Sequence, residues 1–371
     1  MSEPTSRSDD SRDGRLAGPS GWHAGGSGGV VPPGQALLTV RDLRSYLATG
    51  QGVVRAVDGV SLAVHEAEIL GIVGESGCGK TVTCRTIMGL MPAGIVHTSG
   101  EVIYHPRGDQ NLLDASAAQW EALRGAHLAM IFQDPMTALN PVRTIGDQLL
   151  EAVNSHAKLS RSEAQARAIS LLDRVGIPAP ARRMKDYPFQ FSGGMLQRAL
   201  IAIALASSPR LLLADEPTTS LDVIIQDQIL SLLLDLQEGT GMSMIMVSHD
   251  LAVITEVCDR IVVMYAGQVV EEGATADIIT EPRHPYTQAL LEALPQEGQR
   301  GELRSIQGSP PSLIDVADGC RFAPRCRYAT DECRSWDTEL LGTGEREHTA
   351  RCWRHDQIGR SQAWLQGSDS A

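Results

Sequence analysis

Short apolar runs separated by glycine-containing turns open the part of the chain that has a globular pattern. The runs at residues 37–40, 53–57 and 61–64 predict three short strands in an antiparallel arrangement. The run at residues 68–73 is more continuously apolar, as is typical of a strand buried on both faces.

Strands and helices then alternate along the chain. Residues 211–214 and 242–247 have the pattern of buried strands, and residues 223–236 and 251–257 that of helices. This alternation predicts an α/β fold with a mainly parallel sheet covered by helices.

The section from about residue 140 to residue 207 has helical periodicity throughout. One helical face carries three apolar residues at spacings of four: Ile145, Leu149 and Val153. Ser160 and Glu163 have the spacing of a capping box, which marks the start of a further helix. We predict an all-helical subdomain inserted into an α/β core that spans residues 35–273.

The two ends of the chain differ from this core in composition. Residues 1–34 are rich in Ser, Gly and Asp and lack an apolar signal segment, so we expect a disordered leader, or a linker without a role. Residues 274–371 are proline-containing and irregular in pattern. They predict an appended C-terminal region whose end is disordered.

Charge and aromatic content restrict the partners of the chain. Its 371 residues carry a formal net charge of −13, and only 4% are aromatic, which disfavours nucleic acid as a partner. The longest apolar run has eight residues, whereas a membrane-spanning helix needs about twenty. Because the chain is acidic overall, a phosphate ligand would need a local site.

Such a site is predicted directly after the strand at residues 68–73. Eight residues there fit the pattern G-x-x-x-x-G-K-[ST]: Gly74, Glu75, Ser76, Gly77, Cys78, Gly79, Lys80 and Thr81. The glycines let backbone N–H groups converge on phosphate oxygens at a helix start. We expect Lys80 to reach the β- and γ-phosphates and Thr81 to bind Mg²⁺. The alternative is a chance glycine-rich turn.

Two acids end the strand at residues 211–214. We expect Asp215 to lie near the metal and Glu216 to orient and deprotonate the water that attacks the γ-phosphate. Such a pair alone is more often a solvated strand end. The nearby phosphate loop favours the catalytic interpretation.

Between these two halves, Ser192, Gly193 and Gly194 stand at a predicted helix start within FSGGMLQR. Here the chain resembles the ATP-binding-cassette (ABC) ATPases, whose signature follows the pattern LSGGQ. The resemblance implies that this element faces ATP held by a second cassette. Phe191 departs from the usual Leu, and Leu196 from the usual basic residue.

Further matches in the family's order extend the resemblance over about residues 36–273. Gln133 matches the Q-loop glutamine that senses Mg²⁺, Asp222 the D-loop, and His249 the switch histidine at the γ-phosphate. A lone histidine is otherwise more often structural. Tyr46 is a candidate for the aromatic that stacks on adenine, or an exposed turn residue. Ala67 stands at a turn where Gly is common, which matters only if its φ is positive.

Two sequence segments, FQDPMTALNP at residues 132–141 and HPYT at 284–287, are similar to segments of the ATPases of dipeptide and oligopeptide importers. The ATPases of nickel importers share much of these segments. The resemblance implies an ATP-hydrolysing subunit that powers uptake from the cytoplasmic face of the cell membrane. Its implied partners are two transmembrane permeases, a second cassette (a copy or a paralogue) and, through the complex, an extracytoplasmic solute-binding protein. Rival interpretations are a soluble ABC ATPase acting on nucleic acid and a metal-sensing regulator.

The C-terminal region carries four of the seven cysteines: Cys320, Cys326, Cys333 and Cys352. Four thiolates suit zinc or a [4Fe–4S] cluster, although the close CxxC pairs of zinc ribbons are missing. The segment is similar to the extension of peptide-importer ATPases, in which four cysteines bind [4Fe–4S] in a role that we expect to be structural. His348 and His355 are alternative ligands, so zinc stays open as the second interpretation, as do unligated thiols or an oxidised pair. Four arginines would offset the charge of a cluster: Arg321, Arg325, Arg327 and Arg334.

Overall fold

The computed structural model describes residues 35–219, 221–294, 306–314, 316, 318–336, 338–343 and 347–358. The predicted leader at residues 1–34 and the predicted disordered end lie outside the described residues. None of the helices within these described ranges is long and apolar enough to cross a membrane.

The N-terminal strands form a small antiparallel sheet in the order β2-β1-β4. Its strands are β1 (Ala36–Thr49), β2 (Gly52–His65) and β4 (Ile95–Tyr104). The prediction of three short strands was wrong, because β1 and β2 form one long hairpin. Register shifts, such as the one between Val40 and Leu43, interrupt the regular pairing of that hairpin. These bulges break the apolar alternation, so the sequence pattern reads as separate strands.

The larger sheet has the order β10-β11-β9-β8-β3-β7-β6-β5. Strands β8, β3, β7, β6 and β5 pair in parallel, and β9, β11 and β10 add an antiparallel edge. The bounds are β3 (Ile69–Val73), β5 (Leu128–Ile131), β6 (Leu211–Asp215), β7 (Ser243–Ser248), β8 (Arg260–Tyr265), β9 (Gln268–Ala274), β10 (Leu341–Gly342) and β11 (Thr349–Ala350). The predicted parallel α/β core is confirmed, although β5, β8 and β9 were not anticipated.

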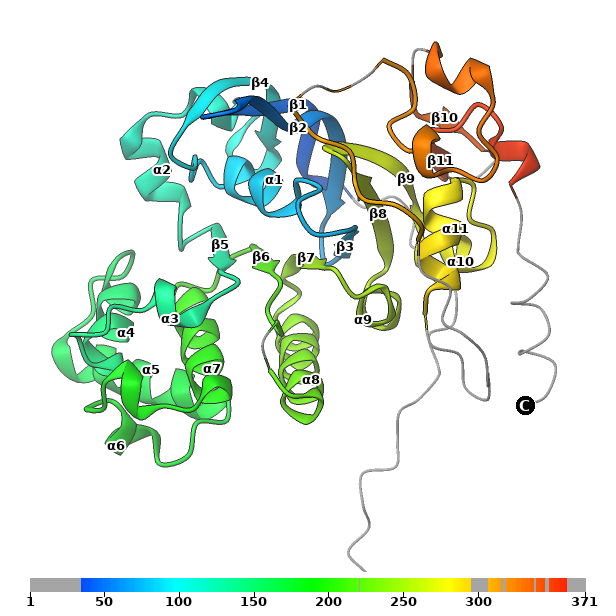
Figure 1. Cartoon of the computed structure of the whole chain (residues 1–371). Helices are drawn as coiled ribbons and strands as arrows, with labels where there is room; N and C mark the ends of the chain where they lie inside the picture. The colour runs from blue at the N-terminus through cyan, green and yellow to red at the C-terminus, as the bar shows by residue number, and fades with distance from the viewer. Residues whose placement is uncertain are drawn as a thin grey trace, which may run out of the picture. The chain divides into compact units, whose positions relative to one another are not determined.

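Two hydrophobic cores lie on opposite faces of this sheet. Leu70 of β3 belongs to the core shared with the small sheet, and Val73 belongs to the core on the other face. The helices around the sheet are α1 (Lys80–Ile87), α2 (Ala117–Leu123), α8 (Val223–Thr240) and α9 (Leu251–Val257). Figure 1 shows the small sheet and α1 above the large sheet, with α8 and α9 below it.

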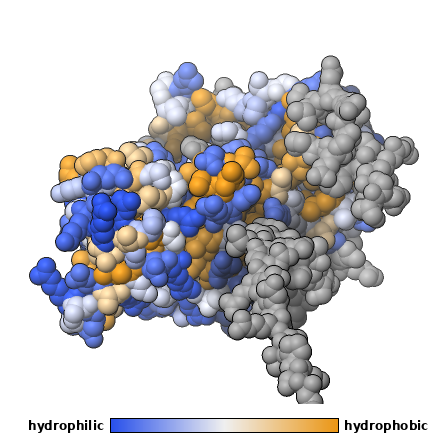
Figure 2. All heavy atoms as spheres, turned by 90° about the horizontal axis from the view of Figure 1, so that it is seen from below, coloured by the Kyte–Doolittle hydropathy of each residue, from blue (hydrophilic) through white to orange (hydrophobic). Residues whose placement is uncertain are grey.

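The segment from residue 140 to residue 207 contains helices and no strand. The hydroxyl of Ser160 accepts a hydrogen bond from the backbone N–H of Glu163, whose carboxylate accepts one from the backbone of Ser160, so the predicted capping box is confirmed. The helices here and just before are α3 (Pro135–Ala138), α4 (Ile145–Asn154), α5 (Arg161–Arg174), α6 (Pro180–Arg183) and α7 (Gly193–Ala204). Figure 2 shows apolar patches among polar residues on the face seen from below.

The chain after residue 274 is more ordered than its pattern predicts. It continues into α10 (Thr275–Thr280) and α11 (Pro285–Glu292), and β11 then pairs with β9 to extend the large sheet. Proline stands at the first position of α11, where its missing N–H costs nothing, so this proline starts a helix instead of breaking one. Short 3-10 turns are η1 (His105–Arg107), η2 (Leu112–Asp114), η3 (Pro188–Gln190), η4 (Ala323–Arg325), η5 (Asp331–Arg334) and η6 (His355–Gln357).

Candidate nucleotide-binding site

The phosphate loop joins the end of β3 to the start of α1. Gly79 has a φ of +106°, and a Cβ atom there would lie 2.1 Å from the backbone oxygen of Ala56. Gly77 also has a positive φ, of +78°. Both positions need glycine because an L side chain would be strained in this region of φ, and at Gly79 it would also collide with β2.

Lys80 is buried inside this loop. Its Nζ atom donates hydrogen bonds to the carbonyl oxygens of Gly74, at 2.7 Å, and Glu75, at 3.2 Å. The same Nζ lies 3.8 Å from Oε1 of Glu216. The loop therefore holds a cation beside Glu216, the residue after β6, where the sequence predicts the γ-phosphate.

Thr81 and Asp215 meet at the start of α1. The Thr81 hydroxyl donates a 2.9 Å hydrogen bond to Oδ1 of Asp215, while Oδ2 of Asp215 is buried without a hydrogen-bond partner. Burial raises the pKa of Asp215, so its charged form lacks stabilisation. An orphaned carboxylate oxygen beside a hydroxyl fits a hard cation such as Mg²⁺. These residues fit the predicted metal.

Glu216 is surrounded by donors from neighbouring strand ends. Its Oε2 atom accepts hydrogen bonds from Nε2 of Gln133 at 3.1 Å and from Oγ1 of Thr219 at 2.8 Å, and it lies 3.1 Å from Nδ1 of His249. Gln133, Glu216 and His249 follow β5, β6 and β7, whose carboxyl ends meet at one edge of the sheet. Sequence reasoning missed Thr219, and nothing in its local pattern marks it.

Ser192 caps α7 by accepting a hydrogen bond from the N–H of Met195 at 3.4 Å. Gly194 packs close to α8, since a Cβ atom there would lie 2.8 Å from Ile225. Asp222 caps α8 through a 3.0 Å hydrogen bond from the N–H of Ile225. Within the part of the chain that the structure describes, no hydrogen bond or ion pair joins Ser192, Gly193 or Gly194 to the phosphate loop. Ser220, beside Asp222, lies outside the described residues.

Tyr46 lies within β1, not in a turn, and pairs with Arg55 of β2. Its hydroxyl donates a 2.6 Å hydrogen bond to Oδ1 of Asp58, and its ring centroid lies 5.0 Å from that of His97. The alternative of an exposed turn residue is wrong, because the bulged hairpin carries the strand past this position.

Comparison with known proteins decides the family. A family model described as ABC transporter matches residues 57–219, which include the phosphate loop and Asp215. The dipeptide transport ATP-binding protein DppD of Escherichia coli is 48% identical over 328 residues, covering 88% of this chain and 99% of that protein. The chain belongs to the ABC transporter ATP-binding proteins. It is an ABC ATPase.

Further similarities place this ABC ATPase more finely. A model described as the oligopeptide/dipeptide transporter C-terminal region matches residues 270–333. A probable peptide ABC transporter ATP-binding protein of Sinorhizobium fredii is 47% identical over 330 residues, covering 88% of this chain and 97% of that protein. The ADP- and phosphate-bound dimer of the cassette MJ0796 superposes with a TM-score of 0.57 at 27% identity, over 64% of this chain and 98% of that one. The chain is thus of the dipeptide/oligopeptide transporter type.

The four C-terminal cysteines of this ABC ATPase line one cavity of about 20 Å³, which is the space of a water molecule. Within the described ranges, no three His, Cys, Asp or Glu residues lie close enough together to hold a metal ion. His348 instead bonds Oε1 of Glu271 at 2.8 Å, and His355 bonds the backbone oxygen of Cys352 at 3.0 Å. Four thiols are donors that zinc or a cluster accepts. In the arrangement described here, however, they do not form a metal-holding group, and their cavity is small for four irons.

The thiols differ in acidity. Burial raises the pKa of Cys326 to about 11 and that of Cys352 to about 12. Burial also opposes ionisation of Cys333, but hydrogen bonds from Thr330 and Trp353 outweigh it and lower the pKa of that thiol. Cys333 is therefore the thiol of the four that ionises most readily.

Three of the four arginines that we expected to offset the charge of a cluster pair with carboxylates on other elements: Arg321 with Asp58, Arg325 with Glu75 and Arg327 with Glu292. Burial raises the pKa of Cys326, and the charge of Arg327 opposes that effect. Arg351 and Arg354 also line the cysteine cavity. Arginine side chains are long enough to reach carboxylates on other elements, so a position beside a cysteine does not determine which group an arginine pairs with.

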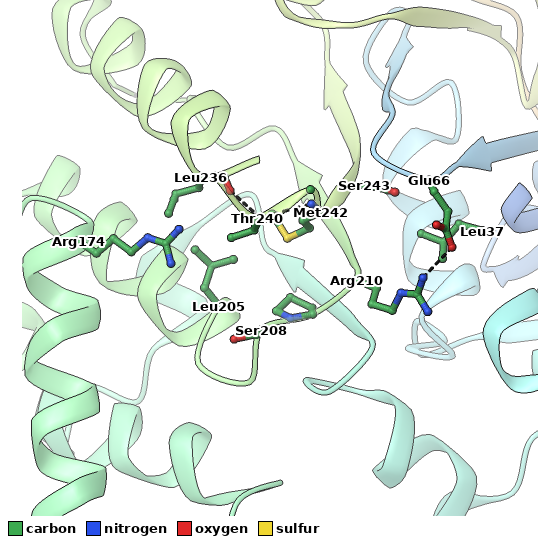
Figure 3. Close-up of a pocket in the computed structure, with 12 residues that line it drawn as sticks. Leu37, Glu66, Arg174, Leu205, Ser208, Arg210, Leu236, Thr240, Met242 and Ser243 are labelled. Atoms are coloured by element: carbon green, nitrogen blue, oxygen red, sulfur yellow. Dashed lines mark hydrogen bonds and ion pairs between the residues drawn. The ribbon is translucent and has the colours of Figure 1, made fainter. Parts of the chain in front are cut away.

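Figure 3 shows a larger cavity, of about 340 Å³. It is lined by Leu205, Pro209, Leu236 and Met242, and Arg210 at its border pairs with Glu66 at 2.7 Å. None of the predicted site residues lines it. The predicted catalytic residues Gln133, Glu216 and His249 follow β5, β6 and β7 and do not line this cavity.

Proposed function

We propose that the chain is the ATP-binding and ATP-hydrolysing subunit of an importer for dipeptides and oligopeptides, at the cytoplasmic face of the cell membrane. The match of residues 270–333 to the peptide-transporter C-terminal region carries this proposal. Relatives with dipeptide transport in their names, 45–48% identical over most of the chain, support it. Nickel is the alternative cargo of the same machinery.

In the proposed site, the backbone of the phosphate loop and Lys80 bind the β- and γ-phosphates. Thr81 and Asp215 would hold Mg²⁺, with Gln133 as the residue that senses it. The ion neutralises charge on the transferring phosphoryl group. Glu216 orients the attacking water and takes its proton, while His249 positions the Glu216 carboxylate and reaches toward the γ-phosphate.

A second cassette completes the proposed site. Ser192, Gly193 and Gly194 begin α7, where N–H groups at a helix start can bind phosphate oxygens. Among the described residues, no hydrogen bond or ion pair joins them to their own phosphate loop, so we assign them to ATP held by a partner. Asp222 lies beside them at the start of α8. The partner is a copy or a paralogue of this chain.

Two membrane permeases are the proposed partners of the helical segment. Three large apolar side chains are exposed near Gln133 in sequence or on the loop before α7: Met136 (54% exposed), Val142 (79%) and Phe189 (70%). Apolar residues exposed near a relay glutamine favour contact with another protein. A solute-binding protein would join through the permeases.

Uptake measurements test the importer proposal. Deleting the gene in the source organism should abolish uptake of labelled dipeptides, and the wild-type chain should restore it while Lys80→Ala should not. Lys185→Ala, which changes a lysine outside the site, is the control and should restore uptake. Loss of nickel uptake with normal dipeptide uptake would move the cargo to nickel, and normal uptake of both would contradict the proposal.

We propose that Cys320, Cys326, Cys333 and Cys352 bind a structural [4Fe–4S] cluster, with zinc as the alternative. Their common cavity and the N–H···S bonds to Cys326 and Cys333 support this proposal. Since the cavity is small, loading must move side chains apart. Anaerobically purified protein should absorb near about 400 nm and contain about four irons per chain. Zinc without iron, or neither metal, would contradict the cluster.

A further inference from the structure

Two arginines of the cysteine-bearing segment (residues 318–352) pair with acids of distant parts of the chain, one in the phosphate loop and one beside Tyr46. Arg325 stands next to Cys326 and pairs with Glu75 of the phosphate loop. Arg321 stands next to Cys320 and pairs with Asp58, the partner of Tyr46. Arg325 lies 250 residues after Glu75 in the sequence, and Arg321 lies 263 residues after Asp58.

The contact at the phosphate end is a two-pronged ion pair. Nη1 of Arg325 lies 2.7 Å from Oε2 of Glu75, and Nη2 lies 2.9 Å from Oε1. The Arg325 side chain is only 5% exposed, and its guanidinium also donates to the hydroxyl of Tyr265 at 3.2 Å. The backbone N–H of Glu75 donates to Tyr286 of α11 at 2.9 Å. Tyr286 of α11 thus binds the backbone of Glu75, and Arg325 of the cysteine-bearing segment binds its side chain.

The contact at the other end is a buried network around Asp58. Oδ2 of Asp58 accepts a hydrogen bond from Arg321, and Oδ1 accepts from Tyr46 at 2.6 Å and from Arg44 at 2.7 Å. The side chains of Arg321 and Asp58 are both nearly buried. Because Asp58 fixes the Tyr46 hydroxyl, Arg321 helps to set the position of the Tyr46 ring.

Charge gives the Arg325 contact a function. A carboxylate within a loop that receives phosphate oxygens repels them, and the repulsion is strong where water is scarce. A two-pronged guanidinium pair neutralises the carboxylate and fixes its direction. Without Arg325, Glu75 would keep its negative charge and gain freedom to turn toward the phosphates.

We propose that Arg321 and Arg325 are positioning residues for ATP, Arg325 acting through Glu75 on the phosphates and Arg321 acting through Asp58 and Tyr46 on the base. The cysteine-bearing segment is then a supporting wall of the nucleotide site. This inference rests on the nucleotide site proposed above.

The same segment supplies a matched control. Arg327 also makes a two-pronged pair, with Glu292 of α11, at 3.0 and 2.6 Å. That pair contacts neither the phosphate loop nor Tyr46. Arg327→Ala therefore removes a two-pronged ion pair of the same segment, with a more exposed arginine (47% against 5%), without changing the proposed positioning contacts.

Nucleotide binding to the purified full chain with Mg²⁺ tests the phosphate end. Arg325→Ala should weaken ATP and UTP alike, by about tenfold. It should raise the KM for ATP more than it lowers kcat. The double variant Arg325→Ala/Glu75→Gln should bind ATP almost as tightly as the single variant Glu75→Gln, because the carboxylate that repels the phosphates is gone. Arg327→Ala should bind as the wild type does.

The ratio of ATP to UTP affinity tests the base end, since a purine stacks on an aromatic ring better than a pyrimidine does. Arg321→Ala should narrow this ratio by about threefold or more. Tyr46→Ala should narrow it as well, and combining the two changes should add little. Thermal unfolding of each variant without nucleotide checks that it is folded.

The outcomes separate this inference from the proposed site. Retained affinity in Lys80→Ala would refute the nucleotide site itself. Lost affinity in Lys80→Ala with unchanged binding in both arginine variants would refute only the positioning roles. An Arg325→Ala defect that Glu75→Gln leaves uncorrected, or that Arg327→Ala reproduces, would overturn the role of Arg325. An Arg321→Ala protein with the wild-type ratio would overturn that of Arg321.

Discussion

The Nδ1 atom of His249 lies 3.1 Å from the Oε2 atom of Glu216, across 33 residues of sequence. The same oxygen accepts a hydrogen bond from Gln133. The carboxylate is therefore oriented by groups from two other strand ends. A base held in this way needs little reorganisation when it accepts a proton, which favours Glu216 as the general base.

Replacing Glu216 with glutamine keeps its shape and removes its ability to take a proton. We expect Glu216→Gln to lower ATP hydrolysis by about 100-fold or more while ATP still binds. Phosphate release and nucleotide binding measure the two effects. Glu238→Gln, which changes an exposed carboxylate of α8, is the control. Full ATPase activity in Glu216→Gln would exclude this residue as the base.

The buried carboxylate of Asp215 lowers the stability of the fold and is also proposed to bind Mg²⁺. Burial raises its pKa, so the ionised form destabilises the fold at neutral pH, and Asp215→Asn should raise the free energy of unfolding by about 1 kcal/mol. The same change removes the charge that would bind Mg²⁺, so the Mg²⁺ concentration needed for ATP hydrolysis should rise more than about tenfold. Urea unfolding and Mg²⁺ titrations measure these effects. An unchanged Mg²⁺ requirement would contradict the assignment.

Ala67 stands at a turn position where Gly is common, and the substitution matters only if φ is positive there. The structure gives Ala67 a φ of +60°. An L side chain is strained in this region, and glycine is not. Ala67→Gly should therefore raise the free energy of unfolding by about 0.5–1 kcal/mol. Ala63→Gly, within β2, should instead destabilise the protein because glycine weakens a strand. Equal losses in both variants would contradict the strain.

His284 is buried at the start of α11, where its Nδ1 accepts the N–H of Tyr286. Burial, with a smaller effect from Arg351, lowers its pKa to about 3. The folded state keeps this imidazole neutral while the unfolded state gains a proton below its usual pKa, so stability falls as the pH drops below about 6.5.

Asparagine can cap the helix without titrating, so His284→Asn should remove this pH dependence. Between pH 7 and pH 5 the wild type should lose about 2 kcal/mol more than the variant. Urea unfolding at the two pH values measures the difference. Parallel stability curves would show that His284 is not held neutral.

Contiguous motifs made much of the site predictable. The phosphate loop, the acids after β6 and the caps at Ser160 and Ser192 all depend on backbone conformations that a few neighbouring residues determine. Continuous apolar runs likewise predicted the buried strands β3, β6 and β7, because their burial on two faces removes polar residues from the pattern.

The sequence alone determined that this chain has a phosphate loop and a buried strand that ends in two acids, since each depends on the spacing of neighbouring residues. Only the tertiary structure decided which distant groups meet: Thr219 and His249 at Glu216, and Arg325 at Glu75. It also decided that Arg321, Arg325 and Arg327 pair with carboxylates on other elements. The physical reason is that a long side chain pairs with an opposite charge that the fold brings close to it. The spacing of residues along the sequence does not predict which distant group that is.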